Sequence, residues 1–292
     1  MAHGNRFDIL IASDGSAAAK AAVTTAVRFP WPDGARGFGV VARHVADYRR
    51  SILLAALDRT AEAVAESTTR TMSRRWPDAQ VLVVNASPVD AILREAARRR
   101  VDVVVMGWRG HGAVRRLLAG SVSRGVVRRA PCAVLVVRRR VREVQRVVIG
   151  FDGSAQARRA VDLIARLHPP RGGRVSLLTA VDSMHVPSQA LLPAGTRAAV
   201  AAEVTRIDSE RRAKAGKDLA IATRTLTTAG WKVSSVVTAG APLRELLATV
   251  ARARADLLVV GATGVTGVRH LLLGSVAEGA LNRSAVPVLV VR

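Results

Sequence analysis

Two stretches of fifteen residues decide the fold: GWRGHGAVRRLLAGS at residues 107–121 and GATGVTGVRHLLLGS at residues 261–275. Both have glycine at the first, fourth and fourteenth positions followed by serine, and they lie 154 residues apart. A short apolar run precedes each one, at residues 101–106 and 257–260. A glycine-rich loop between a strand and a helix lets the main chain approach an anion, and the helix N-terminus offers unpaired N–H groups. The repeated motif therefore predicts two similar halves, each with a phosphate-binding loop.

Length supports the same division, because 292 residues suggest about two domains of roughly 150 residues each. We place the first domain at residues 1–140 and the second at 144–292, joined by a short charged connector. The sequence opens without a basic-then-apolar leader and holds no run of 18 apolar residues. We therefore expect a cytoplasmic protein that does not enter the membrane.

The net charge of +23 comes almost entirely from arginine. It fits an affinity for polyanions, but it fits better an arginine-, alanine- and valine-rich composition in which the charges are solvated. Aromatic residues make up only 3% of the chain, which argues against a stacking platform for single strands. Binding of protein or nucleic acid through the arginine-rich surface therefore stays an alternative of lower rank.

Cysteine and histidine give no metal-binding signal. The one cysteine, Cys132, lies beside the apolar run 134–137 and is expected to be a small buried hydrophobic residue. The six histidines show no spacing typical of metal ligands. His111 lies inside the first glycine loop, where it is either a phosphate contact or a solvated loop residue.

The two halves show the same alternation of apolar runs and helical patterns. In the first half we predict strands at 7–13, 37–45, 81–85, 101–106 and 133–137, and helices at 16–28, 48–75, 89–99 and 121–129. In the second half we predict strands at 147–151, 175–181, 233–238, 257–260 and 288–291, and helices at 154–167, 196–229, 243–252 and 275–282.

Near-continuous Val, Ile and Leu strands between helices predict a doubly wound parallel sheet covered on both faces. Such a sheet binds ligands at the carboxyl ends of its strands. The apolar last strands, 133–137 and 288–291, would aggregate if exposed, so we expect them to meet inside one chain. The second half is 16 residues longer between its first and fourth strands, and we assign most of the excess to a loop at 182–195.

Three features together resemble the universal stress protein family in its tandem two-domain form. They are a first strand that ends in Asp (Asp14 and Asp152), the late glycine loop, and a terminal strand such as PVLVV at 287–291. The resemblance covers nearly the whole chain. It implies a five-stranded parallel sheet of order 3-2-1-4-5 in each half, a role in a stress response, and binding of ATP, alone or with Mg²⁺.

The resemblance also implies site residues. At the first site these are Asp14, Val45, Met106, Gly107, Gly110, Gly120, Ser121 and Ser123; at the second they are Asp152, Ala180, Val260, Gly261, Gly264, Gly274 and Ser275. A carboxylate at a strand end accepts hydrogen bonds from ribose hydroxyls, while glycine N–H groups and serine hydroxyls suit phosphate oxygens. Two simpler interpretations stay open: the Asp residues cap helices, and the glycine loops are tight connections without a ligand.

The second half departs from the pattern in the first turn of the helix after the loop. Ser123 corresponds to Ala277, and Arg124 corresponds to Glu278. The second site would thus lack one hydroxyl donor and gain a carboxylate near the phosphates. On this basis we expect two unequal sites, the first binding more tightly.

Other nucleotide-binding patterns are absent: the glycine loop does not follow the first strand as the dinucleotide motif does, and no G-x4-G-K-[ST] loop occurs. The loops hold arginines that stabilise charge but no candidate general base. We therefore expect a non-enzymatic nucleotide sensor or regulator whose two domains pair within the chain. A slow ATPase or phosphotransferase is the alternative, and further pairing into a homodimer stays open.

Overall fold

The computed structural model describes residues 6–43, 51–108, 120–182, 193–264 and 273–292. The elements of the first half are β1 (Asp8–Ala12), α1 (Ala17–Arg28), β2 (Arg36–Arg43), α2 (Ser51–Met72), β3 (Gln80–Asn85), α3 (Pro88–Arg99), β4 (Val103–Gly107), α4 (Ser121–Arg129) and β5 (Ala133–Val137). Those of the second half are β6 (Arg146–Gly150), α5 (Ala155–Ala165), β7 (Arg174–Val181), α6 (Ala194–Thr228), β8 (Lys232–Ala239), α7 (Pro242–Arg252), β9 (Leu257–Gly261), α8 (Ser275–Arg283) and β10 (Val288–Val291). Every predicted strand and helix is present in the predicted order.

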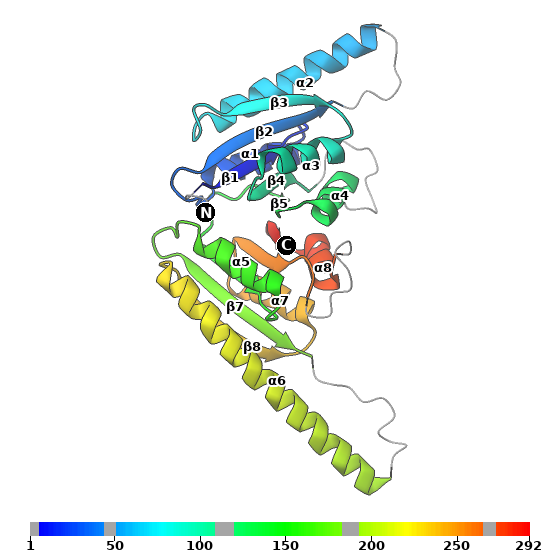
Figure 1. Cartoon of the computed structure of the whole chain (residues 1–292), viewed down its shortest axis with the longest axis vertical. Coiled ribbons are helices and arrows are strands. Elements are labelled where there is room, and N and C mark those ends of the chain that lie inside the picture. Colours follow the sequence, from blue (N-terminus) through cyan, green and yellow to red (C-terminus); the bar gives the residue numbers. More distant parts are fainter. Residues whose placement is uncertain (1–5, 44–50, 109–119, 183–192, 265–272) are drawn as a thin grey trace.

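All ten strands form one sheet in the order β3-β2-β1-β4-β5-β10-β9-β6-β7-β8 (Figure 1). Within each half the strands are parallel and follow the predicted order 3-2-1-4-5, read in opposite directions from the centre. The doubly wound fold predicted from the sequence is thereby confirmed.

The two halves meet through their last strands. β5 and β10 pair antiparallel, with Leu135 opposite Leu289 and with flanking valine pairs. Both strands are fully buried along their length. This is the internal pairing expected from their apolar sequences, since it removes an edge that would otherwise be exposed.

Successive apolar side chains of each strand point to opposite faces of the sheet, so a hydrophobic core forms on each face. One face packs against α1, α2, α5 and α6 and buries residues such as Ile9, Leu135 and Leu289. The other face packs against α3, α4, α7 and α8 and buries residues such as Val134 and Val290. Each core contains residues from both halves, so the hydrophobic contacts run through the junction without interruption.

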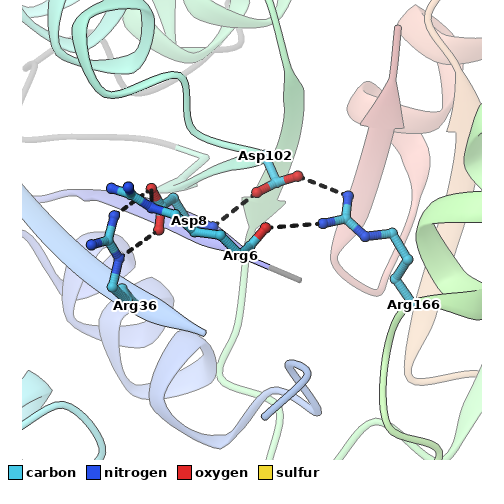
Figure 2. Close-up of polar contacts among 5 residues, drawn as sticks. All are labelled: Arg6, Asp8, Arg36, Asp102 and Arg166. Atoms are coloured by element: carbon cyan, nitrogen blue, oxygen red, sulfur yellow. Dashed lines mark hydrogen bonds and ion pairs between the residues drawn. The ribbon is translucent and has the colours of Figure 1, made fainter. Parts of the chain in front are cut away.

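A charged network adds a second contact between the halves (Figure 2). The side chain of Asp8 is buried and accepts hydrogen bonds from the Arg36 guanidinium at 2.9 and 2.8 Å and from Arg6 at 2.8 Å. The Asp102 carboxylate accepts the Asp8 N–H at 2.8 Å and, through its other oxygen, an N–H of Arg166 at 2.8 Å. Because Arg166 follows α5, this network links the start of β1 to the second half.

The additional residues of the second half lie mainly in a helix. At the 154-residue offset Ser51 corresponds to Thr205, so α6 begins 11 residues earlier than α2, and these residues make up most of the 16 extra ones. The prediction that the loop at 182–195 holds most of the excess is therefore wrong. In the parts of the chain that the structure describes, no helix has the length and apolar character needed to cross a membrane.

Candidate functional site

Both glycine loops join the carboxyl end of a strand to the start of a short helix. Gly120 and Gly274 occupy the N-cap positions of α4 and α8, and no side chain of the described residues caps either helix. Ser121 and Ser275 are the first helical residues, and both are exposed. Two helix N-termini without a side-chain cap among the described residues thus lie at the carboxyl edge of the sheet, where doubly wound folds bind ligands.

A cavity of about 1090 Å³ opens at this edge in the second half. All seven residues that the resemblance implies for the second site line it: Asp152, Ala180, Val260, Gly261, Gly264, Gly274 and Ser275. Its volume suits a ligand of nucleotide size. The side chain of Val260 belongs to the hydrophobic core, so only the main chain of this residue is available to a ligand.

Fewer of the residues implied for the first site are described. Val45 and Gly110 lie outside the described residues. Asp14 is exposed at the end of β1, whereas the side chain of Met106 is buried in the core, as that of Val260 is. Of the other residues implied for this site, Gly107 is the last residue of β4, and Gly120 and Ser121 lie at the start of α4.

Asp14 and Asp152 shape the loops between the first strand and helix of each half. Asp14 accepts the N–H of Ser16 at 3.0 Å, and Asp152 accepts that of Ser154 at 2.9 Å. The helix caps are the serines themselves, since Ser16 and Ser154 accept the N–H groups of the third helical residues at 3.1 Å. The interpretation of the Asp residues as helix caps is therefore wrong, because each one holds a turn before the cap.

Asp152 also faces the glycine loop. A Cβ atom added to Gly264 would lie 2.7 Å from Oδ2 of Asp152. The carboxylate and the loop are thus in van der Waals contact, and glycine is the residue that leaves them room. This contact places a carboxylate directly beside the glycine motif.

The first glycine of each motif has a packing role. A Cβ atom on Gly107 would lie 2.7 Å from the carbonyl carbon of Ala18 and 2.8 Å from the nitrogen of Ala19. In the second half, a Cβ atom on Gly261 would lie 3.0 Å from Cβ of Gln156. Glycine is needed at this position because the end of β4 or β9 closely approaches the first turn of the first helix of the same half, α1 or α5.

The structure gives Ser123 a role different from the predicted phosphate contact. Its side chain is buried, and the hydroxyl lies 2.9 Å from the carbonyl oxygen of Trp108 and 3.0 Å from that of Gly120. The hydroxyl therefore ties the end of β4 to the start of α4. The counterpart Ala277 is equally buried.

Arg124 and Glu278 are engaged with each other rather than solvated separately. They approach each other at 3.7 Å across the contact between α4 and α8, and Arg128 approaches Glu278 at 3.4 Å. Arg124 further donates to the side-chain oxygen of Asn282 at 3.2 Å. The two reasons for expecting a tighter first site therefore lose their basis, because the hydroxyl and both charges have partners within the protein.

Sequence reasoning missed the walls of the second cavity. Helix α7 contributes Pro242 and Leu246, and helix α6 contributes Arg211, Lys214 and Asp218. Aligning α2 with α6 at the 154-residue offset would have revealed the charged residues, because the first half has Thr60 and Val64 where the second has Lys214 and Asp218.

Cys132 is partly buried, where the sequence predicts a buried residue, and it packs against the core that contains Val134. Burial raises the pKa of the Cys132 thiol to about 12, which keeps it protonated at neutral pH. No group of three His, Cys, Asp or Glu side chains suited to a metal ion occurs within the described ranges.

Comparison with known proteins gives one consistent family. The family model described as "Universal stress protein family" matches residues 6–138 and again residues 143–292. A universal stress protein of Mycobacterium tuberculosis is 32% identical over 222 residues, which cover 72% of this chain and 68% of the relative. One of Thermus aquaticus is 39% identical over 136 residues, covering 44% of this chain and 97% of the relative. The crystal structure of a universal stress protein from Archaeoglobus fulgidus has the same fold, with a TM-score of 0.69 at 19% identity over 98% of this chain and 96% of that one.

Proposed function

The chain belongs to the universal stress protein family, and we propose that it binds ATP, alone or with Mg²⁺, as a non-enzymatic nucleotide sensor or regulator. One site would lie in each of the domains 1–140 and 144–292. The observation that carries the proposal is the second cavity, where the Asp152 carboxylate, the glycine loop and the uncapped N-terminus of α8 meet.

The three parts match the parts of a nucleotide. The carboxylate accepts hydrogen bonds from the ribose hydroxyls, and the close contact of Gly264 with Asp152 sets the phosphates beside it. The main-chain N–H groups at the start of α8 donate to phosphate oxygens, and the helix dipole favours their negative charge. Leu178, Leu246 and Pro242 give the cavity an apolar side for the base.

Calorimetric titration with ATP tests the proposal. We expect binding to the wild type and loss of the second-site phase in Asp152→Ala. The control is Asp162→Ala, which removes the same charge from an exposed position on α5 outside the cavity wall. No ATP binding by the wild type, or equal binding by the two variants, would contradict the proposal. Phosphate release measured in the same samples separates binding from the alternative of slow hydrolysis.

A further inference from the structure

The α6 helix forms a wall of the second cavity. Thirty-five residues at about 1.5 Å each span roughly 52 Å, whereas the eight-residue strand β7 spans roughly 26 Å. The helix must therefore extend past the sheet, as Figure 1 shows. Arg211, Lys214 and Asp218 lie on one face of α6 at helical spacing and line the cavity together with Asp152 and Gly264.

Two of these side chains are cations available to a ligand. Among the residues that the structure describes, Lys214 has no hydrogen bond or ion pair. Arg211 has only a contact of 4.0 Å with Asp208, at the limit of an ion pair. Asp218, by contrast, is paired with Arg158 at 3.8 Å. The face of α6 toward the cavity therefore carries more available positive than negative charge.

The first half provides an internal comparison. Gly15 abuts Val64 and Gly153 abuts Asp218, so these helix positions are equivalent at the 154-residue offset. By the same offset, Thr60 stands where Lys214 is, and Leu57 stands where Arg211 is. The cations are thus specific to the second half.

The carboxylates on the cavity wall do not cancel this difference. Asp152 has a counterpart, Asp14, in the first half. Asp218 has a cation beside it, Arg158 on α5, at 3.8 Å. Asp182, which follows β7, is the remaining acidic residue on the cavity wall, where Arg211 and Lys214 supply two positive charges.

We infer that Lys214 and Arg211 bind the phosphates of a nucleoside polyphosphate in the second cavity. The second site then discriminates among nucleotides by the number of their phosphates and binds ATP more tightly than the first site does. The inference rests on the proposed function, which it extends to residues outside the glycine motif.

The test compares ATP, AMP and adenosine by calorimetry in the wild type, the double variant Arg211→Ala/Lys214→Ala, and Lys217→Ala. Lys217 lies on the same helix, is exposed and does not line the cavity, so its removal is a matched control. The second site is assigned as the binding phase that Asp152→Ala abolishes. Alanine favours helix, so α6 is expected to persist, and circular dichroism checks that it does.

The double variant is expected to weaken ATP binding at the second site about tenfold, near the lower end of the effect of losing hydrogen bonds to a charged group. AMP should lose less, adenosine nothing, and Lys217→Ala should match the wild type. Equal ATP affinity in the double variant and Lys217→Ala would overturn the inference alone. Equal losses for ATP and adenosine would overturn it too, since they would indicate a displaced helix. A wild type that binds no ATP would overturn the proposed function and this inference with it.

Discussion

Replacing Ser123 by alanine separates a structural role from a ligand contact. The hydroxyl is buried and reaches two main-chain carbonyl oxygens, those of Trp108 at 2.9 Å and Gly120 at 3.0 Å. A hydroxyl has one proton and donates one hydrogen bond at a time, so the alanine variant loses one hydrogen bond. We therefore expect Ser123→Ala to lower stability and to leave ATP binding unchanged.

The magnitude follows from the burial of the bond. A net contribution of about 1 kcal/mol for the hydrogen bond, increased by the desolvated carbonyl left behind, gives about 1–2 kcal/mol. For a chain of this size, that loss lowers the melting temperature by roughly 2–5 °C. Differential scanning calorimetry measures the shift, and titration of the same sample with ATP measures binding.

The second half offers the reverse variant as a control. Ala277 is buried at the equivalent position, and Ala262 stands where Trp108 stands in the first half. Ala277 also lines the second cavity, but a serine there can donate to the same kind of main-chain carbonyl as Ser123 does, so we expect Ala277→Ser to leave ATP affinity unchanged. A tenfold loss of ATP affinity in Ser123→Ala with an unchanged melting temperature would refute the reasoning, because it would place the hydroxyl on the ligand.

Three further predictions concern the fold. Leu289→Ala should lower the free energy of unfolding by about 2–5 kcal/mol, and it should do so for both halves together because the hydrophobic core crosses the junction. Hydrogen exchange at the indole N–H groups of Trp31 and Trp231 follows the two halves separately. A shift confined to the second half would contradict unfolding as one cooperative unit. Burial raises the pKa of the Cys132 thiol to about 12, so this thiol should react with iodoacetamide at pH 8 only slowly in the native protein and quickly in urea. Fast labelling of the native protein would contradict this prediction, because it would show that the thiol is accessible. Gly107→Ala should destabilise the protein by about 1–3 kcal/mol in chemical denaturation, since the added Cβ would lie 2.7 Å from main-chain atoms of α1. Wild-type stability of this variant would contradict the prediction, because it would mean that β4 and α1 move apart without an energetic cost.

The sequence predicts the fold of this chain well because the signals for strands and helices are local and occur twice. The strands are near-continuous runs of Val, Ile and Leu, and serines cap helices at the predicted starts, as at Ser16 and Ser154. Each element of one half can also be checked against its counterpart in the other half. The pairing of β5 with β10 also follows from the sequence, because an apolar edge strand needs a partner.

The direction of individual side chains could not be predicted in the same way. Arg124 and Glu278 pair across the contact of α4 with α8, and that contact exists only once the two halves are joined. Ser123 turns inward because a main-chain carbonyl lies within reach, which depends on how β4 and α4 are placed. The contribution of Lys214 likewise depends on tertiary placement, since α6 reaches the cavity from a distant part of the sequence.

A crystal structure of the protein with ATP tests the central claim most directly. The account predicts nucleotide density in the second cavity, with the ribose beside Asp152 and the phosphates against the loop and the first turn of α8, where Gly274 and Ser275 lie. Nucleotide bound elsewhere on the chain, or an empty cavity at saturating ATP, would contradict it.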